Sequence, residues 1–268
     1  MNENIKWVAC AVGVVGLSIG AVIYRDKWWN DKPAPPAKPV ATVQEKPVIP
    51  APTTEPAVRH PIPAVDVDQA LPSLDSSDVP VQTSIAELLG LEAAKQFVSP
   101  ENLVRNIVVS IDNLPEQKVA ERIRPLQRVP GTFAVGGPED APVLDPANYE
   151  RYKPLVQSIH SLDTQRLVAT YQRFYPLFQE SYEGLGSGPK YFNDRLIEVI
   201  DHLLETPEVR EPIALARPSV QYEFADPKLE SLSAGQKLLI RMGSENAATV
   251  KTKLREVRGA IVGSPESR

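Results

Sequence analysis

Residues 163–204 read DTQRLVATYQRFYPLFQESYEGLGSGPKYFNDRLIEVIDHLL, and they decide the fold of this chain. Their apolar side chains recur every three or four residues, which is the period of one face of an α-helix. Asp163 is a preferred N-cap residue for a first helix, and the glycine-rich stretch 184–188 ends that helix. A second helix is expected over Phe192–Leu204. Two amphipathic helices joined by a short loop predict a helical domain.

The same period extends to both sides of this stretch. We expect further helices over residues 81–97, 100–111, 115–124, 146–160, 229–242 and 244–261. Gly90 is a candidate break within the first of these, and Ser99 and Ser244 are candidate N-caps. Residues 132–135 and 213–224 are the strand candidates. The expected fold class is mostly α: an orthogonal helical bundle with at most one small two-stranded β element.

An uncharged apolar run, WVACAVGVVGLSIGAVIY, occupies residues 7–24 after a short tail at 1–6. At a rise of about 1.5 Å per residue, a helix of this length spans roughly 27 Å, close to the thickness of a bilayer core. Trp7 and Tyr24 place amphipathic rings at its two ends. A cleaved signal peptide is the alternative, but no small-residue cleavage site follows the run. We therefore expect a single transmembrane helix.

The apolar run also contains a close-packing pattern. Gly16 and Gly20 form a GxxxG pair, which lets two membrane helices approach closely. Glycine is common in membrane helices in general, so the pair is open to a second interpretation. A homodimer through Gly16 and Gly20 is one expectation.

A proline-rich stretch at residues 25–70 separates this run from the rest of the chain. Proline fixes φ and lacks an amide donor, so a disordered and extended linker is expected, with a reach on the order of 100 Å. Its PxxP spacings could alternatively bind a partner groove. Arg25 and Lys27 favour a cytoplasmic domain by the positive-inside rule. The six-residue tail and the long spacer favour the opposite orientation, with the domain in the periplasm and the helix in the inner membrane.

Residues 71–262 have the length and apolar content of one helical domain, and 263–268 are expected to be a disordered tail. The 29 basic and 34 acidic residues of the chain give a formal charge of −5, which argues against a nucleic-acid partner. Cys10 is the only cysteine, so the domain has neither disulfides nor thiolate metal ligands.

Four runs in this domain resemble a bacterial family, the domain of unknown function number 3014. They are LDPANYERY (144–152), YPLFQESYEGLG (175–186), YFNDRLIEVIDHLLETPEV (191–209) and YEFADPKLESLSAGQKLLIRMG (222–243). The resemblance extends in order from about Leu71 to Ile261. It implies one N-terminal membrane segment, a proline-rich spacer and one domain. It implies no activity, and so no catalytic residues.

The helix at 192–204 carries most of the polar candidates. Glu198, Asp201 and His202 lie within one turn of each other and are the candidate metal ligands. The alternative is a solvated acidic face, with Arg195 paired to a neighbour. A second set could converge on a polar pocket or form a structural network: Asn193, Asp194, Arg195, Gln236, Lys237 and Arg241.

Aromatic residues concentrate between 149 and 192, and they favour either a core or a groove for a peptide, glycan or partner helix. The chain has no GxSxG, HExxH or phosphate-loop motif. We therefore expect a non-enzymatic interaction or scaffold module of the cell envelope, with no cofactor, bound to the inner membrane through Trp7–Tyr24 and to an envelope protein. The alternative is an envelope enzyme or a small-ligand or cation-binding domain that uses the acidic face at 194–205.

Overall fold

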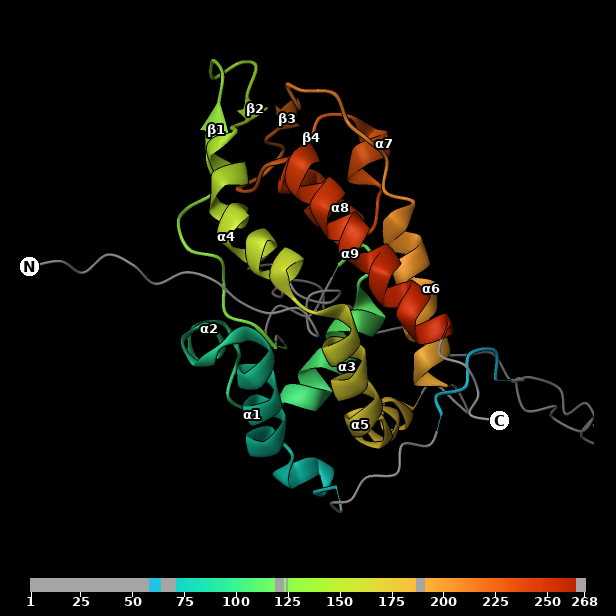
Figure 1. Cartoon of the computed structure of the whole chain (residues 1–268). Helices are drawn as coiled ribbons and strands as arrows, with labels where there is room; N and C mark the ends of the chain where they lie inside the picture. Colours follow the sequence, from blue (N-terminus) through green and yellow to red (C-terminus); the bar gives the residue numbers. More distant parts are fainter. Residues whose placement is uncertain (1–57, 64–70, 119–122, 124, 187–190, 264–268) are drawn as a thin grey trace, which may run out of the picture.

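The computed structural model describes residues 58–63, 71–118, 123, 125–186 and 191–263. Within these ranges the chain forms nine α-helices and two antiparallel two-stranded sheets, which confirms the mostly helical class (Figure 1). The described part contains no helix both long and apolar enough to cross a membrane. The expected transmembrane helix at 7–24 and the Gly16–Gly20 pair lie outside the described residues.

The helices and strands of the described residues follow one another along the chain. In order they are α1 (Asp78–Leu89), α2 (Leu91–Phe97), α3 (Leu103–Asn113), β1 (Val135–Gly136), β2 (Val143–Leu144), α4 (Ala147–Ser161), α5 (Thr164–Glu183), α6 (Phe192–Leu204), β3 (Leu215–Ala216), β4 (Glu223–Phe224), α7 (Pro227–Glu230), α8 (Ala234–Arg241) and α9 (Ser244–Val262).

Helix α5 is central to the packing. The Asp163 side chain accepts a hydrogen bond from the Arg166 amide at 2.8 Å, which confirms it as the N-cap. The expected apolar face is confirmed, because all six of its residues are buried: Leu167, Val168, Tyr171, Phe174, Tyr175 and Phe178. The helix packs against α3, α6 and α9, and α9 also contacts α4 and α8. These contacts enclose the main core.

The first two helices match their prediction, and the third begins later than expected. Gly90 separates α1 from α2 with φ of 88°, a conformation that favours glycine. Ser99 is not the N-cap of α3, which starts at Leu103. The Asp78 carboxylate instead accepts the amides of Asn102 and Leu103 at 2.8 and 2.7 Å. The cap comes from another helix, so the local sequence could not indicate it.

The helix expected over 115–124 is wrong where the structure describes it, because residues 115–118 form turns. The carbonyls of Leu114 and Glu116 accept the amides of Gly235 and Ala234, at 3.0 and 2.7 Å. This stretch therefore satisfies the first amides of α8, which no intrahelical carbonyl can reach.

The helix expected over 229–242 is two helices, α7 and α8. Ser233 lies between them and caps the second: its hydroxyl accepts the Gln236 amide at 3.2 Å, and the Gln236 side chain accepts the Ser233 amide. This reciprocal capping box starts a new helix within a continuous apolar pattern.

The β content is larger than expected. Residues 213–224 form a hairpin, β3 with β4, instead of one strand, and β1 pairs with β2 through Val135 and Leu144. A bridge between Val143 and Ala214 joins the two ribbons. The ribbons cover a second, smaller core around Phe224 and Ile240. The final helix, α9, begins at Ser244 with Gly243 as the N-cap residue, one position before the expected cap.

Candidate functional site

The start of α6 is held by side chains from α5. The Phe192 amide donates to Gln179 Oε1 at 2.8 Å, and the Asn193 amide contacts the Tyr175 hydroxyl at 3.4 Å. Phe192 stacks on Phe178 with ring centroids 5.9 Å apart. These contacts satisfy the first amides of the helix and fix its first turn.

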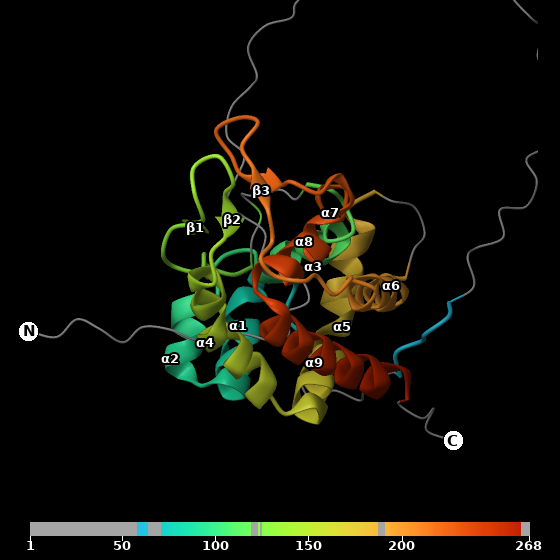
Figure 2. The same cartoon turned by 90° about the horizontal axis from the view of Figure 1, so that it is seen from above.

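A segment of the chain that bends at Arg59 and His60, residues 58–63, binds at this first turn. The Asp194 carboxylate accepts the amide of Arg59 at 3.0 Å and that of His60 at 2.7 Å. Asn193 Nδ2 donates to the His60 carbonyl at 2.8 Å, and the Tyr191 hydroxyl accepts the Ile62 amide at 2.8 Å. Figure 2 shows the segment in blue running beside α6.

The sequence predicts that residues 58–63 belong to the linker. In the structure, four hydrogen bonds hold the main chain of this segment against the domain. The first residue that contacts the domain is therefore not Leu71, and sequence reasoning missed this segment. Its sequence signal is weak, since only Ile62 adds a large aliphatic side chain that packs on the core.

Buried side chains of the core position the groups that bind the segment. Asn193 is fully buried, and its Oδ1 accepts the buried Tyr171 hydroxyl at 3.0 Å. Burial raises the pKa of Tyr171 well above its ordinary value, so the hydroxyl stays a neutral donor. Because Oδ1 is occupied in this way, the Asn193 amide nitrogen must face the segment. The site is preorganised by the core.

One side chain of the segment is recognised by charge. Arg59 forms an ion pair with Glu198, and that hydrogen bond and charge raise the pKa of the guanidinium. The pair is exposed to solvent, so it contributes little stability but selects a positive charge. Three of the six side chains of the segment are exposed: those of Val58, Arg59 and Pro61.

The expected metal ligands have separate protein partners. Glu198 pairs with Arg59, Asp201 accepts a two-pronged hydrogen bond from Arg258, and His202 shares a hydrogen bond with the Ser233 hydroxyl at 2.8 Å. Within the described ranges, no group of three His, Cys, Asp or Glu side chains could hold a metal ion. Helix α6 thus presents a paired polar face.

The expected polar pocket divides into two groups on different elements. Asn193 and Asp194 bind the segment, while Arg195 donates to Asp112 at 2.7 Å. Gln236 belongs to the α8 capping box and also donates to the His202 carbonyl at 3.1 Å.

The other two residues of the expected pocket lie on α8 near the second core. Lys237 pairs with Glu230 at 2.7 Å, and Arg241 lies over the Phe224 ring at 5.2 Å. Burial lowers the pKa of Arg241. Lys237 and Arg241 therefore take part in the packing around the ribbons, and neither residue lines the site.

The aromatic set lies mostly in the core. Six of its members are buried: Tyr171, Phe174, Tyr175, Phe178, Tyr182 and Phe192. Tyr191 is half-buried, and its hydroxyl binds the segment, as expected for an aromatic at the rim of a peptide site.

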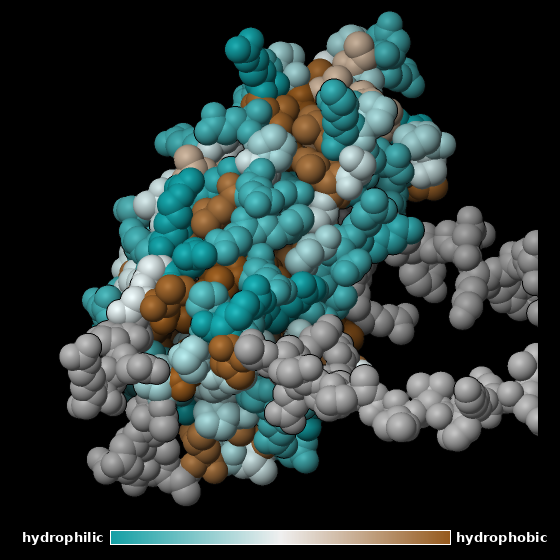
Figure 3. Space-filling model, turned by 90° about the vertical axis from the view of Figure 1, so that its right-hand side faces the viewer, coloured by the Kyte–Doolittle hydropathy of each residue, from teal (hydrophilic) through white to brown (hydrophobic). Residues whose placement is uncertain are grey.

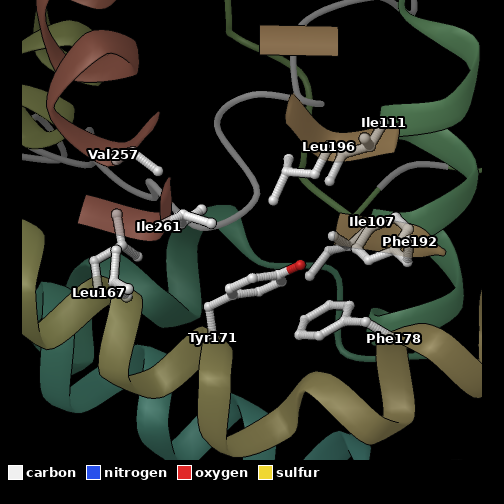
Figure 4. Close-up of a pocket in the computed structure, with 10 residues that line it drawn as sticks. Ile107, Ile111, Leu167, Tyr171, Phe178, Phe192, Leu196, Val257 and Ile261 are labelled. Carbon is white, nitrogen blue, oxygen red and sulfur yellow. The ribbon is translucent and has the colours of Figure 1, made fainter. Parts of the chain in front are cut away.

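A small apolar cavity of about 30 Å³ lies under the site, between α3, α5, α6 and α9 (Figure 4). Its lining includes Ile107, Leu196 and Ile261 as well as the ring of Tyr171. An apolar lining of this kind offers a water molecule no hydrogen-bond partners apart from that hydroxyl. The cavity is part of the core and does not reach the segment.

The surface around α6 is mainly polar. Figure 3 shows this side of the molecule, where hydrophilic residues cover most of the face and hydrophobic residues form separate small patches. Contacts on this face therefore depend on hydrogen bonds and charge more than on apolar area.

The chain matches the family described as protein of unknown function (DUF3014) over residues 103–258, which is more than half of its length, and it belongs to this family. The matched range runs from the start of α3 into α9 and includes the binding residues of α6. Comparison with curated proteins and with solved structures found no match.

Proposed function

We propose that this protein is a membrane-tethered, non-enzymatic interaction module of the bacterial cell envelope. In this proposal, residues 7–24 anchor the chain in the inner membrane as a single transmembrane helix, a disordered proline-rich linker follows, and the domain works in the periplasm. Gly16 and Gly20 would allow two anchors to pair. The uncharged run with aromatic ends and the proline-rich stretch support this arrangement.

The observation that carries the proposal is the site on α6. Tyr191, Asn193 and Asp194 bind a short segment through its main-chain amides and carbonyl. Hydrogen bonding to the main chain of a bound peptide is a recurring mode of protein interaction domains. An interaction module needs such a site, whereas a purely structural helix start does not.

The alternative, an enzyme or a cation-binding domain that uses residues 194–205, has less support. Glu198 and Asp201 are neutralised by arginines, and His202 is bound to Ser233. A cation would have to replace these partners before it could bind.

Membrane orientation is tested with a reporter fused to the C-terminus that is active only outside the cytoplasm. We expect activity in intact cells, and loss of it when residues 7–24 are deleted. A reporter active only inside the cytoplasm would contradict the periplasmic assignment.

The interaction is tested by placing a photo-crosslinking residue at position 198, beside the site, in living cells. A matched control places it at Glu245, an exposed residue at the start of α9. We expect a discrete crosslinked product at position 198 that is missing at 245. Equal crosslinking at both positions would speak against a specific interaction face.

A further inference from the structure

We propose that the site on α6 binds, in trans, a peptide with the pattern of residues 59–63: a basic residue, a residue with a free amide, a proline, an aliphatic residue and a second proline. The chain's own segment then occupies the site as an intramolecular competitor. This inference rests on the proposed function, and it adds the class of partner and the way in which access is controlled.

The main-chain contacts define where the peptide needs an amide. The site accepts the main-chain amides of Arg59, His60 and Ile62. Pro61 lies between the last two residues and has no amide hydrogen to donate. The site therefore tolerates proline at one position and excludes it at the neighbouring one. Prolines at 61 and 63 also fix two φ angles of the free peptide, which reduces the entropy lost on binding.

Two side-chain contacts add selectivity. Glu198 lies beside Arg59, and it also lies 3.6 Å from Arg195, so its carboxylate is held at the edge of the site. Ile62 is half-buried and packs against the main core. A basic residue and an aliphatic residue three positions later are therefore the side chains that the site distinguishes.

The contacts of the bound segment allow a free peptide to replace it. It is held mostly by its main chain, and the side chains of Val58, Arg59 and Pro61 are exposed. Seven residues, 64–70, separate it from Leu71 along the chain. Because the segment belongs to the same chain as the site, it competes with any free peptide, which binds only in proportion to the fraction of open sites.

The chain itself contains a near-match that serves as a control peptide. Residues 46–50 read KPVIP, whereas 59–63 read RHPIP. The basic residue, the isoleucine and the final proline coincide, but Pro47 stands where His60 must donate its amide. A synthetic peptide of this sequence should fail at the site for that single reason.

The experiment uses the full chain in detergent and a fluorescent peptide of residues 56–65, PAVRHPIPAV. In the His60→Pro variant the chain's own segment loses one required amide, so the site opens. We expect this variant to bind the peptide about tenfold more tightly than the unmodified chain. Adding Asp194→Ala to this variant should abolish binding. The peptide of residues 43–52, VQEKPVIPAP, should not bind any of these proteins.

Absence of peptide binding by the His60→Pro variant, with an unchanged circular dichroism spectrum, would overturn recognition in trans. Equal binding of the 43–52 peptide would overturn main-chain recognition at position 60. A concentration-dependent dimer of the unmodified chain that Asp194→Ala abolishes would support the site and identify a second copy as the source of the peptide. The reporter and crosslinking experiments fail or succeed independently of these outcomes.

Discussion

Gly243 is a single residue on which the entry into α9 depends. Its φ of 88° favours glycine, and a Cβ at this position would lie 2.6 Å from Cγ of Tyr149. We expect Gly243→Ala to lower the free energy of unfolding by about 2–4 kcal/mol, from the left-handed backbone and from overpacking against the ring. Chemical denaturation monitored by circular dichroism measures this loss.

Gly259, in the last turn of the same helix, provides the control. A Cβ there would meet no atom within 4 Å, and its φ is not in the left-handed region. Gly259→Ala should leave stability unchanged or raise it by up to about 1 kcal/mol, because alanine is the better helix former. Equal losses at the two glycines would show that the contact with Tyr149 is not the cause.

At the scale of elements, α8 depends on its capping box. Ser233→Ala removes the acceptor for the Gln236 amide and the partner of His202, and both residues are in or beside the core. We expect a loss of about 0.5–2 kcal/mol in the free energy of unfolding. Ser231→Ala is the control, since that exposed hydroxyl only donates to the Lys228 carbonyl. A loss as large at 231 would argue against the capping role.

The stability that the contact between α9 and the start of α5 gives to the fold should depend on pH. Glu256 accepts hydrogen bonds from Lys253 and Thr164, and these contacts lower its pKa. A lowered pKa in the folded state means that the ionised group stabilises the fold above its ordinary pKa, near 4.3, and that this contribution disappears as the pH falls through the folded value.

The measurement compares the unmodified protein with Glu256→Gln from pH 7 downward. Because the side chain is 45% exposed, we expect a stability difference below about 1 kcal/mol at pH 7. The difference should shrink as the pH falls below about 4. A difference that stays constant with pH would mean that the charge of Glu256 does not matter.

At the scale of the whole molecule, the bound segment determines where the linker meets the domain. Residues 58–63 lie beside α6, far from the ribbons β1–β2 and β3–β4 at the other end of the molecule (Figure 1). The linker therefore meets the domain beside α6 and not beside the ribbons.

Trypsin tests this attachment in the full chain. The amides of Arg59 and His60 both bind Asp194, so the segment must open before trypsin can cleave after Arg59. We therefore expect slow cleavage there, and at least tenfold faster cleavage in Asp194→Ala. Cleavage after the exposed Arg210 provides an internal control and should not change. Mass spectrometry of fragments that begin at His60 gives the rates. Equal rates in both proteins would mean that the segment is not held by Asp194.

Elements with local signals could be predicted from the sequence. The bounds of α6, the Gly90 break and the Asp163 cap all follow from residues within one or two turns. The start of α3 and the division of α7 from α8 could not be predicted in full, because Asp78 caps α3 from another helix, and the apolar pattern continues across Ser233. Residues 115–118 do not form a helix, because the carbonyls of Leu114 and Glu116 accept the first amides of α8.

The candidate site also has a part that could be predicted from the sequence and a part that could not. Asn193 and Asp194 are among the polar candidates that the sequence of this helix indicates, and both belong to the site. Their partner could not be identified, since more than 130 residues separate it from α6 and its proline content indicates a linker.

The sequence by itself determines a helical domain, membership of its family and the polar residues of α6, because helical periodicity and capping depend on neighbours along the chain. Only the tertiary structure decides that these residues bind a segment that lies far away along the chain. The reason is physical: buried Tyr171 orients Asn193, and the amides of Arg59 and His60 reach Asp194 only when distant parts of the chain pack together.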